Sequence, residues 1–428
     1  TGYLAGLVVE LVAMSFNVGG GYFMVLSTGS SIGSGIGFCL SGTITGTSGS
    51  DISFVSNNVI SQSGAINLAA NVSGTAASVT YDTSSGNRLS TITGGTITIA
   101  STSSTSAINY LMKSSGSALD PGTVGTSSVR LPGTITIDNT YGGSPSASAY
   151  LTTSTFTSTN TTSSVGITVD NALYATGNIS LTGISYGQMG ISYSTYINSS
   201  SGDITLTGST TGYYGVYTGS SYAVAANNIT IAGNSSTTIT GWLVYLNALT
   251  INSGSTGGDI LVTATGASAG GGNGIYQAGA ISGANGSDIT FRSNNVISQN
   301  GAITLAANTT ATSTVTFDTT SGNKSSSITT GSLTLTSGSN QDVNYIAKTS
   351  GGTIVIGGAV GVNGTITLDN TYGCATSGCT PATGYITTSN YSTLATTSYG
   401  VQTTSGTLTA VKDIVIDAIS YGNYAWYS

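Results

Sequence analysis

Asp51 to Asn71 reads DISFVSNNVISQSGAINLAAN, and Asp288 to Asn308 reads DITFRSNNVISQNGAITLAAN. Seventeen of these 21 positions are identical, at an offset of 288 − 51 = 237 residues. Within each segment, aliphatic or aromatic residues alternate with Ser, Thr or Asn, and a period of two is typical of strands with one buried face. A segment that returns after a long interval indicates a repeat architecture.

The similarity between the two copies continues beyond these segments. YDTSSGN at Tyr81–Asn87 returns as FDTTSGN at Phe317–Asn323, and GTITIDNTYG at Gly133–Gly142 returns as GTITLDNTYG at Gly364–Gly373. No Pro-rich break or change of composition separates the copies. The sequence therefore predicts one solenoid without a linker, with a first repeat unit at residues 1–238 and a second, incomplete unit at 239–428.

The N-terminal residues fit the same scheme, because TGYLA at Thr1–Ala5 aligns with TGWLV at Thr240–Val244. The apolar stretch from Tyr3 to Leu26 is accordingly interpreted as strands of the repeat, and no signal segment or membrane insertion is expected. The chain is expected to begin inside one unit and to stop inside the next. It is then either a section of a longer polypeptide or a subunit that stacks end to end.

A shorter pattern recurs within each copy: a small residue, a polar residue, and two aliphatic or aromatic residues separated by one position. We count fifteen such pairs, among them Ile179/Leu181, Ile204/Leu206 and Ile229/Ile231, which follow one another at intervals of 25 residues. Intervals of about 20–25 residues suit one coil of a stacked solenoid. The predicted fold is all-β, a right-handed parallel β-helix (β-solenoid) forming a continuous rod of about 17–21 coils.

Composition excludes several classes of protein. Charged residues make up 5% of the 428, with 7 Lys+Arg, 14 Asp+Glu and no His, against about 25% in an ordinary domain. So few cations cannot neutralise a run of phosphates, so nucleic acid is not an expected partner. Strong helix formers are scarce, which argues against a helical protein. The absence of His excludes Ser–His and Cys–His relays and most zinc sites.

Gly and Asn are expected at the corners between strands, where left-handed turns and stacked side-chain amides are favourable. The Asn residues assigned to corners are Asn57, Asn58, Asn139, Asn294, Asn295 and Asn370.

Parallel β-helices also include polysaccharide lyases and glycosidases, whose sites need clustered carboxylates. The candidates recur once per unit, as Asp51/Asp288, Asp82/Asp318 and Asp138/Asp369. Asp138 and Asp369 each lie in a D-N-T sequence after a strand, where a carboxylate that caps a turn is the simpler interpretation. The Gly-rich segments lack the Asp spacing of a calcium-binding repeat. No enzyme activity, catalytic residue, metal site or cofactor is therefore predicted.

Two cysteines lie in GCATSGCTP, where the second copy is four residues longer than the first. Cys374 and Cys379 are predicted to form a disulfide that closes this inserted loop, which implies an oxidising compartment. Free thiols are the alternative. Cys39 has no counterpart in the other copy and is expected to be a small buried residue.

Tyrosine is abundant, with 24 residues. Stacked on successive coils, tyrosines could form an aromatic contact surface for sugar rings or a neighbouring fibre, whereas packing inside the coils or beneath loops is the alternative. The residues assigned to this surface are Tyr186, Tyr193, Tyr196, Tyr213, Tyr214, Tyr217, Tyr222, Tyr421, Tyr424, Trp426 and Tyr427.

Four segments carry a resemblance to a known family: GNISLTG (Gly177–Gly183), GAINLAAN (Gly64–Asn71), GTITIDN (Gly133–Asn139) and DITFRSNN (Asp288–Asn295). They resemble the strand repeats of filamentous-haemagglutinin-like exoproteins, which are long secreted bacterial adhesins folded as parallel β-helices. The resemblance implies the same fold and a location outside the cell. The secretion domain that begins proteins of that family does not appear here.

The first hypothesis for function is an extracellular structural or adhesive fibre of a bacterial cell surface. Its expected partners are the protein itself, through end-to-end or lateral contacts, and glycans of a host or neighbouring cell. The alternative is a carbohydrate-binding or carbohydrate-active β-helix protein. An ice-binding solenoid is a weaker alternative, because the Thr-x-Thr triplets at Thr43–Thr45, Thr96–Thr98 and Thr134–Thr136 do not recur on every coil.

Overall fold

A computed structural model describes most of the chain. The described residues are 9–11, 15–18, 20–29, 32–141, 162–219, 223–225, 227–247, 250–252, 258–283, 286–305, 311–335, 341–373, 384–385, 395–396 and 398–428. Spatial contacts divide the chain into two compact units, Thr1–Gly212 and Tyr213–Ser428. The predicted division at 238/239 rests on sequence similarity alone and stays a prediction, as does the continuity of the rod.

The first unit has three faces of parallel sheet, and most coils of the chain add one strand to each face. Its first sheet contains β1 (Val9–Leu11), β4 (Ile36–Leu40), β7 (Val59–Gln62), β10 (Ile92–Thr93), β13 (Leu119–Asp120), β15 (Ile167–Val169) and β18 (Met189–Tyr193). The second contains β3 (Tyr22–Ser27), β6 (Asp51–Ser56), β9 (Ala77–Thr83), β12 (Ile108–Ser114), β14 (Ile135–Asp138), β17 (Ile179–Ser185) and β20 (Ile204–Thr210). The third is formed by β2 (Ser15–Val18), β5 (Thr43–Gly46), β8 (Ile66–Leu68) and β11 (Ile97–Ile99), and by the pair β16 (Leu173–Ala175) and β19 (Ile197–Ser199).

The second unit repeats this arrangement. Its first sheet contains β21 (Tyr214–Thr218), β24 (Val244–Leu246), β27 (Asn273–Gln277), β30 (Val296–Gln299), β33 (Ile328–Thr330), β36 (Ile354–Ile356), β41 (Val401–Thr403) and β44 (Trp426–Tyr427). The second contains β23 (Ile229–Asn234), β26 (Ile260–Thr265), β29 (Ile289–Ser293), β32 (Ser313–Thr319), β35 (Val343–Thr349), β38 (Ile366–Asp369) and β43 (Ile414–Asp417). The third contains β22 (Ala223–Ala225), β25 (Thr250–Asn252), β28 (Ile281–Gly283), β31 (Ile303–Leu305), β34 (Leu333–Leu335), β37 (Val360–Val362) and β42 (Leu408–Ala410), and β39 (Tyr372–Gly373) pairs antiparallel with β40 (Gly384–Tyr385).

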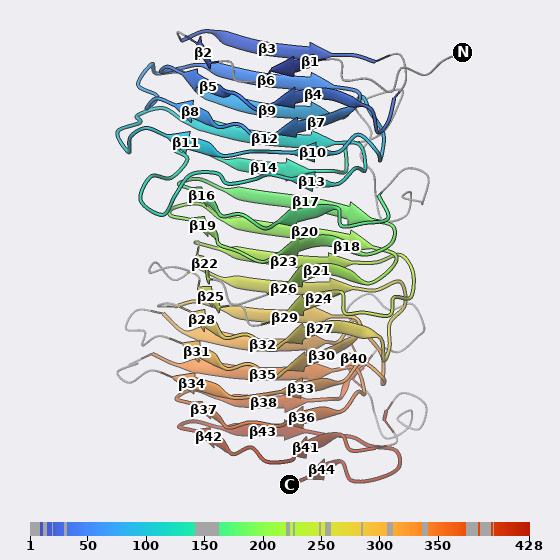
Figure 1. The fold of residues 1–428 in the computed structure, drawn as a ribbon. Coiled ribbons are helices and arrows are strands. Elements are labelled where there is room, and N and C mark those ends of the chain that lie inside the picture. The colour runs from blue at the N-terminus through green and yellow to red at the C-terminus, as the bar shows by residue number, and fades with distance from the viewer. Residues whose placement is uncertain are drawn as a thin grey trace, which may run out of the picture. The chain divides into compact units, whose positions relative to one another are not determined.

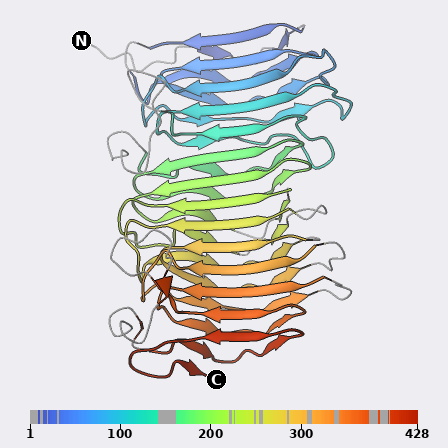
Figure 2. The ribbon, with the colours of Figure 1, turned by 180° about the vertical axis from the view of Figure 1, so that it is seen from behind.

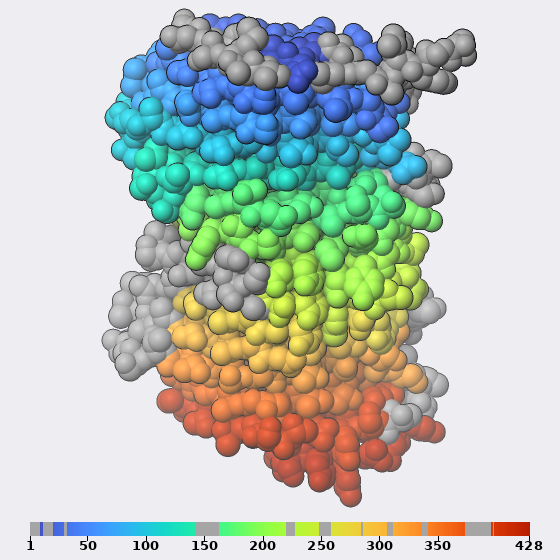
Figure 3. Space-filling model, viewed as in Figure 1, coloured from blue at the N-terminus to red at the C-terminus, as the bar shows by residue number. Residues whose placement is uncertain are grey.

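These sheets confirm the predicted all-β solenoid of stacked parallel coils, and the described residues form no helix. Figure 1 shows the strands of each unit in layers, and Figure 2 shows the same strands from behind. In the space-filling view of Figure 3, successive coils within a unit form successive bands of colour, because each coil occupies its own layer.

The predicted number of coils is wrong, because the described residues form about 12 turns instead of 17–21. The prediction assumed one coil for about every 20–25 residues, whereas several aliphatic pairs lie on different strands of one longer coil. Ile289 and Phe291 lie in the second sheet, for example, and Ile303 and Leu305 lie in the third sheet two corners later, after β30 of the first sheet. A coil is also longer than expected: Ile260 pairs with Ile289, which is 289 − 260 = 29 residues further along the chain.

The core of each unit is built from columns of equivalent inward residues. One column in the second sheet of the first unit runs through Ile52, Val79, Tyr110, Ile135, Ile179 and Ile204, each paired with the next in register and each almost fully buried. Beside it, the rings of Phe54 and Tyr81 lie 5.2 Å apart. Phe291 and Phe317 stack at 4.9 Å in the second unit. Burial of such side chains is worth about 1.5–3 kcal/mol each.

Two of the Asn residues assigned to corners lie where a strand ends, and their amides bond to backbone groups of neighbouring coils. The stacking of side-chain amides stays a prediction. Asn139 is fully buried, and its Nδ2 donates to the carbonyl oxygens of Ser117 (2.9 Å) and Ile184 (3.0 Å). Its Oδ1 accepts the N–H of Ile184 at 2.7 Å. Asn370 makes the equivalent contact with Ile419 in the second unit. The amide thus replaces the backbone pairing that the chain loses where a strand ends.

A second set of side chains marks the start of strands in the second sheet. Here an Asn or Asp side chain accepts the backbone N–H of the equivalent residue on the following coil. Asp259 accepts from Asp288 at 3.0 Å, and Asp288 accepts from Thr314 at 2.7 Å. The same contact joins Asn178 to Asp203 and Asn109 to Thr134 in the first unit. Each following strand therefore begins at a defined residue.

We predict that Asn139→Ala locally loosens the coil that follows. The substitution leaves the Ile184 N–H and two buried carbonyl oxygens without their partner, and each such loss costs about 1–3 kcal/mol. Hydrogen exchange followed by mass spectrometry should show about 10- to 100-fold faster exchange in peptides containing Ile184. Asn67→Ala, at an exposed strand position, is the control. Unchanged exchange at Ile184 would show that the amide does not hold this corner.

Candidate functional site

The structure separates the aromatic residues that were assigned to one contact surface. Tyr186, Tyr196 and Tyr213 have largely exposed side chains. Tyr421, Tyr424, Trp426 and Tyr427 are also exposed. Tyr214 and Tyr217 are half-buried on β21. Tyr222, and the predicted disulfide between Cys374 and Cys379, lie outside the described residues.

Tyr193 does not belong to a contact surface, and its assignment is corrected. It is 1% exposed, because it follows Ile191 at a spacing of two on β18 and both side chains point into the coil. Cys39 is also corrected, since it points outward on β4 between Glu10 and Ser61 and is half-buried as a free thiol. In both cases the direction of the side chain follows from the strand's alternation and not from the residue type.

An aromatic ladder does occur in the first sheet of the second unit. It consists of Tyr217, Tyr245 and Tyr276, which are paired in register on β21, β24 and β27. The ring centroids are 5.4 Å apart for Tyr217 and Tyr245 and 4.8 Å apart for Tyr245 and Tyr276, with planes within 21° and 20° of parallel. Their neighbours along each strand point into the core, so the three rings lie on the outside of the coils.

Other aromatic rings pack against both ends of this ladder. Tyr214 lies 5.0 Å from Tyr217 and 5.4 Å from Tyr245, and Trp242 lies 5.4 Å from Tyr276. Because the rings of the ladder stack on one another, their faces are largely covered and their edges and hydroxyl groups face outward. Sugar rings stack on the faces of aromatic side chains, so the ladder is better suited to edge contacts and hydrogen bonds than to sugar stacking.

Three members of this group, Trp242, Tyr245 and Tyr276, are absent from the predicted surface. A signal for two of them exists, because VYT (Val216–Thr218), VYL (Val244–Leu246) and IYQ (Ile275–Gln277) repeat an aliphatic–Tyr pattern. Their spacings of 28 and 31 residues exceed the coil length of about 20–25 residues assumed from the sequence. The underestimated coil length is the reason that this ladder was missed.

We predict that the second unit becomes less stable at high pH because of Tyr214 and the aromatic rings packed around it. Burial, and then the neighbouring phenols, raise the pKa of Tyr214 from 10.0 to about 12. Between these values the unfolded chain has lost a proton that the folded chain retains, so the free energy of unfolding falls as pH rises from about 10 to about 12. Urea unfolding read by tryptophan fluorescence should show this fall and should show it reduced in Tyr214→Phe.

Both tryptophans of the chain, Trp242 and Trp426, lie in the second unit, so the fluorescence reports on that unit. Tyr186→Phe, an exposed tyrosine of the first unit, is the control and should keep the wild-type pH dependence. An identical alkaline profile for wild type and Tyr214→Phe would contradict the prediction.

Two of the three pairs of carboxylates that were weighed as catalytic candidates cap turns, whereas Asp51 and Asp288 accept hydrogen bonds from Ser78 and Thr314 on the following coils. The Oδ1 of Asp138 accepts the N–H and the hydroxyl of Thr140 at 2.7 and 2.6 Å. Asp369 accepts the same two groups of Thr371 at 2.8 and 2.7 Å. The predicted turn-capping role is confirmed for both residues. Asp82 and Asp318 make the equivalent contacts with Ser84 and Thr320.

The same carboxylates form outward columns with a lysine in the second sheet of each unit. In the first unit, Asp82, Lys113 and Asp138 are paired in register on β9, β12 and β14. The Nζ of Lys113 lies 3.0 Å from the Oδ2 of Asp82 and 5.0 Å from the centre of the Tyr141 ring. We name Asp82, Lys113, Asp138 and Tyr141 the first charged cluster.

The second unit contains the equivalent group. Asp318, Lys348 and Asp369 are paired in register on β32, β35 and β38. The Nζ of Lys348 lies 3.5 Å from the Oδ2 of Asp318 and 5.2 Å from the centre of the Tyr372 ring. We name these four residues the second charged cluster. Arg292, at 3.6 Å from the same Oδ2, adds a cation that the first cluster lacks, because Val55 occupies its place there.

Burial raises the pKa of both Asp138 and Asp369 above the ordinary aspartate value, despite the hydrogen bonds from Thr140 and Thr371. A carboxyl group whose pKa is higher in the folded state binds a proton more readily there than in the unfolded chain. The free energy of unfolding then falls as pH rises through the interval between the two pKa values.

We therefore predict that Asp369→Asn stabilises the second unit at pH 7 and not at pH 3. The Asn side chain keeps an acceptor for Thr371 and removes the cost of a buried charge. Urea unfolding followed by tryptophan fluorescence at the two pH values measures the difference. Asp369→Ala, which removes the acceptor as well, should not stabilise. If Asp369→Asn were less stable than wild type at pH 7, attraction to Lys348 would outweigh the cost of burial.

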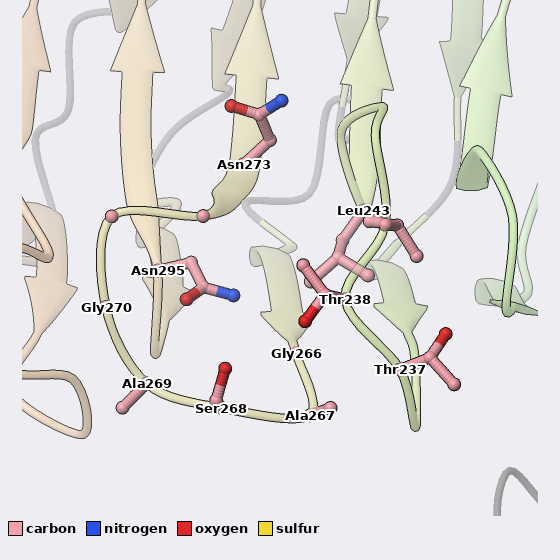
Figure 4. A pocket seen from close by; sticks show the side chains of 13 residues that line it. Thr237, Thr238, Leu243, Gly266, Ala267, Ser268, Ala269, Gly270, Asn273 and Asn295 are labelled. Carbon is pink, nitrogen blue, oxygen red and sulfur yellow. The ribbon is translucent and has the colours of Figure 1, made fainter.

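One hollow in the second unit is lined by a glycine-rich loop. It has a volume of about 150 Å³ and lies between the Gly266–Gly272 loop, the side chains of Thr237 and Thr238, and Asn295. In Figure 4 the Asn295 side chain lies inside the curve of this loop. No charged side chain lines the hollow, and it is smaller than the roughly 300–1,000 Å³ of typical ligand pockets. It offers neutral hydrogen-bonding groups and no catalytic chemistry.

Within the part of the chain that the structure describes, no three His, Cys, Asp or Glu residues are grouped so that they could hold a metal ion. Nor do these residues include a helix of the length and hydrophobicity needed to cross a membrane.

Comparisons of the chain with family models, with curated proteins and with solved structures found no match. What the structure defines is therefore the class of fold, a β-solenoid. The resemblance to filamentous-haemagglutinin-like exoproteins rests on the four sequence segments that carry it.

Proposed function

We propose that this chain is a section of an extracellular structural or adhesive fibre on a bacterial cell surface, as a filamentous-haemagglutinin-like protein would be. Its task in this proposal is to provide a stiff, repetitive support that makes contact with other surfaces. Its partners are copies of itself, through end-to-end or lateral contacts, and glycans of a host or neighbouring cell.

The observation that carries the proposal is the in-register stacking of equivalent residues within each unit. Inward columns such as Ile52 to Ile204 bury one coil against the next. A coil of this kind cannot bury its apolar face alone, so the architecture favours length over a compact shape. A stack that can be lengthened coil by coil suits a mechanical role.

The outward residues support a location outside the cell. They are mostly Ser, Thr and Asn, which are hydrated and uncharged, and the lysines of both charged clusters are paired with aspartates. The net charge of −7 disfavours indiscriminate association of the fibres. No enzyme activity is proposed, since the repeated carboxylates Asp138 and Asp369 are engaged in turn caps.

The aromatic ladder supplies a contact surface for this proposal. Tyr217, Tyr245 and Tyr276 present ring edges and hydroxyl groups in a row on one sheet. Tyrosine is favoured in protein contacts because it offers a large, rigid area together with a hydroxyl group. A neighbouring fibre or the hydroxyl groups of a glycan could pair with such a row.

The proposal predicts that the protein is found on the outside of intact cells. Antibodies raised against the purified chain should label the surface of unpermeabilised cells of the source organism in immunogold electron microscopy, with labels aligned along filaments. Antibodies against a cytoplasmic protein are the control and should label only permeabilised cells.

Labelling that requires permeabilisation would contradict an extracellular role. Surface labels without any filament would contradict the fibre, and the role of an adhesive surface protein would remain. The release of reducing sugars from polysaccharides by the purified chain would instead favour the alternative of a carbohydrate-active β-helix.

A further inference from the structure

The two charged clusters place an amine against a carboxyl group on neighbouring coils in the same way. Lys113 and Asp82 lie directly opposite each other on β12 and β9, and Lys348 and Asp318 lie opposite each other on β35 and β32. The Nζ–Oδ2 distances are 3.0 and 3.5 Å. Ionisable residues are rare in this chain, so the recurrence of the whole cluster in both units is notable.

We propose that Lys113 forms an intramolecular amide (isopeptide) bond with Asp82, and Lys348 with Asp318, so that neighbouring coils become covalently linked. The proposal concerns a modification of the chain by its own side chains. It needs no partner and does not depend on the proposed function.

The surroundings of each lysine limit access of water. The side chains of Lys113 and Asp82 are 22% and 17% exposed, and those of Lys348 and Asp318 are 27% and 7% exposed. The rings of Tyr141 and Tyr372 lie above the two Nζ atoms. Partial exclusion of water slows the hydrolysis of an amide once it has formed.

A second carboxyl group is present on the other side of each lysine. Asp138 lies opposite Lys113, and Asp369 lies opposite Lys348, on the following strand. Burial raises the pKa of both carboxyl groups, so each holds a proton to higher pH than an exposed aspartate. Each lies two strands away from the carboxyl group that reacts, so the proposed bond forms between the lysine and its nearer partner alone.

The reaction balances within each cluster. The neutral Nζ of Lys113 attacks the Cγ of Asp82, a C–N bond forms, and one C–O bond breaks as its oxygen leaves as water. The nitrogen gives up two protons in all, and the departing oxygen takes both as it leaves as water. An ammonium and a carboxylate thus become a neutral amide and one water molecule, with no oxidant or cofactor. Two groups held in contact react as if present at about 10⁵–10⁸ M.

The two clusters differ in one respect that affects the reaction. Arg292 also contacts the Oδ2 of Asp318, whereas Val55 stands at the equivalent position beside Asp82. Lys348 thus shares this oxygen with a second cation and lies farther from it, at 3.5 Å, than Lys113 lies from Asp82, at 3.0 Å. The bond in the first unit should therefore form faster than the bond in the second.

The test is the intact mass of the purified, folded full-length chain. We expect a mass lower than that of the sequence by one water molecule per bond, and by two when both units have reacted. Fragment spectra should show Lys113 joined to Asp82 and Lys348 to Asp318. Lys113→Arg and Lys348→Arg keep the cation, and each should abolish one loss of water.

Loss of water by cyclisation of an aspartate would persist in both lysine variants, which would overturn the proposal. A wild-type mass equal to that of the sequence would overturn it as well. A single loss that disappears in Lys113→Arg would support the bond in the first unit and overturn it in the second.

Discussion

The hydrogen bonding between equivalent residues of successive coils is the constraint on which each unit depends. In a parallel sheet every strand fixes the position of the next, and a shift by one residue would turn all inward side chains outward. The columns from Ile52 to Ile204 and from Ile229 to Ile366 show this constraint in the two units, because every member is apolar or aromatic and buried. The stacked tyrosines and the paired charges follow from that register.

The fold was largely predictable because its signal is local. Alternation of aliphatic and polar residues identifies strands, and the repetition of Asp51–Asn71 at Asp288–Asn308 identifies stacking. The number of coils was not predictable in this way. An aliphatic pair in the first, second or third sheet looks the same in sequence, so the spacing between pairs does not give the length of a coil.

The candidate sites were less predictable because they depend on neighbours distant in the chain. Asp82 and Lys113 are 31 residues apart in sequence and touch only because one coil separates them. Tyr193 was assigned to the surface although its strand position turns it inward. Tyr245 and Tyr276 align with Tyr217 only when the true length of the coil is known, so the sequence alone did not reveal this ladder. The turn caps of Asp138 and Asp369 were predictable, since they involve only the next two residues.

The side chains that begin the strands of the second sheet have a consequence for how the sequence can change. Asn178, Asp259 and Asp288 each accept an N–H from the coil that follows, so they mark where that coil's strand must start. The lengths of the connecting segments between strands are then less constrained. Residues can be gained or lost in them during evolution without displacing the strands. The two copies differ in this way, with offsets that drift from 237 at Asp51/Asp288 to 231 at Asp138/Asp369.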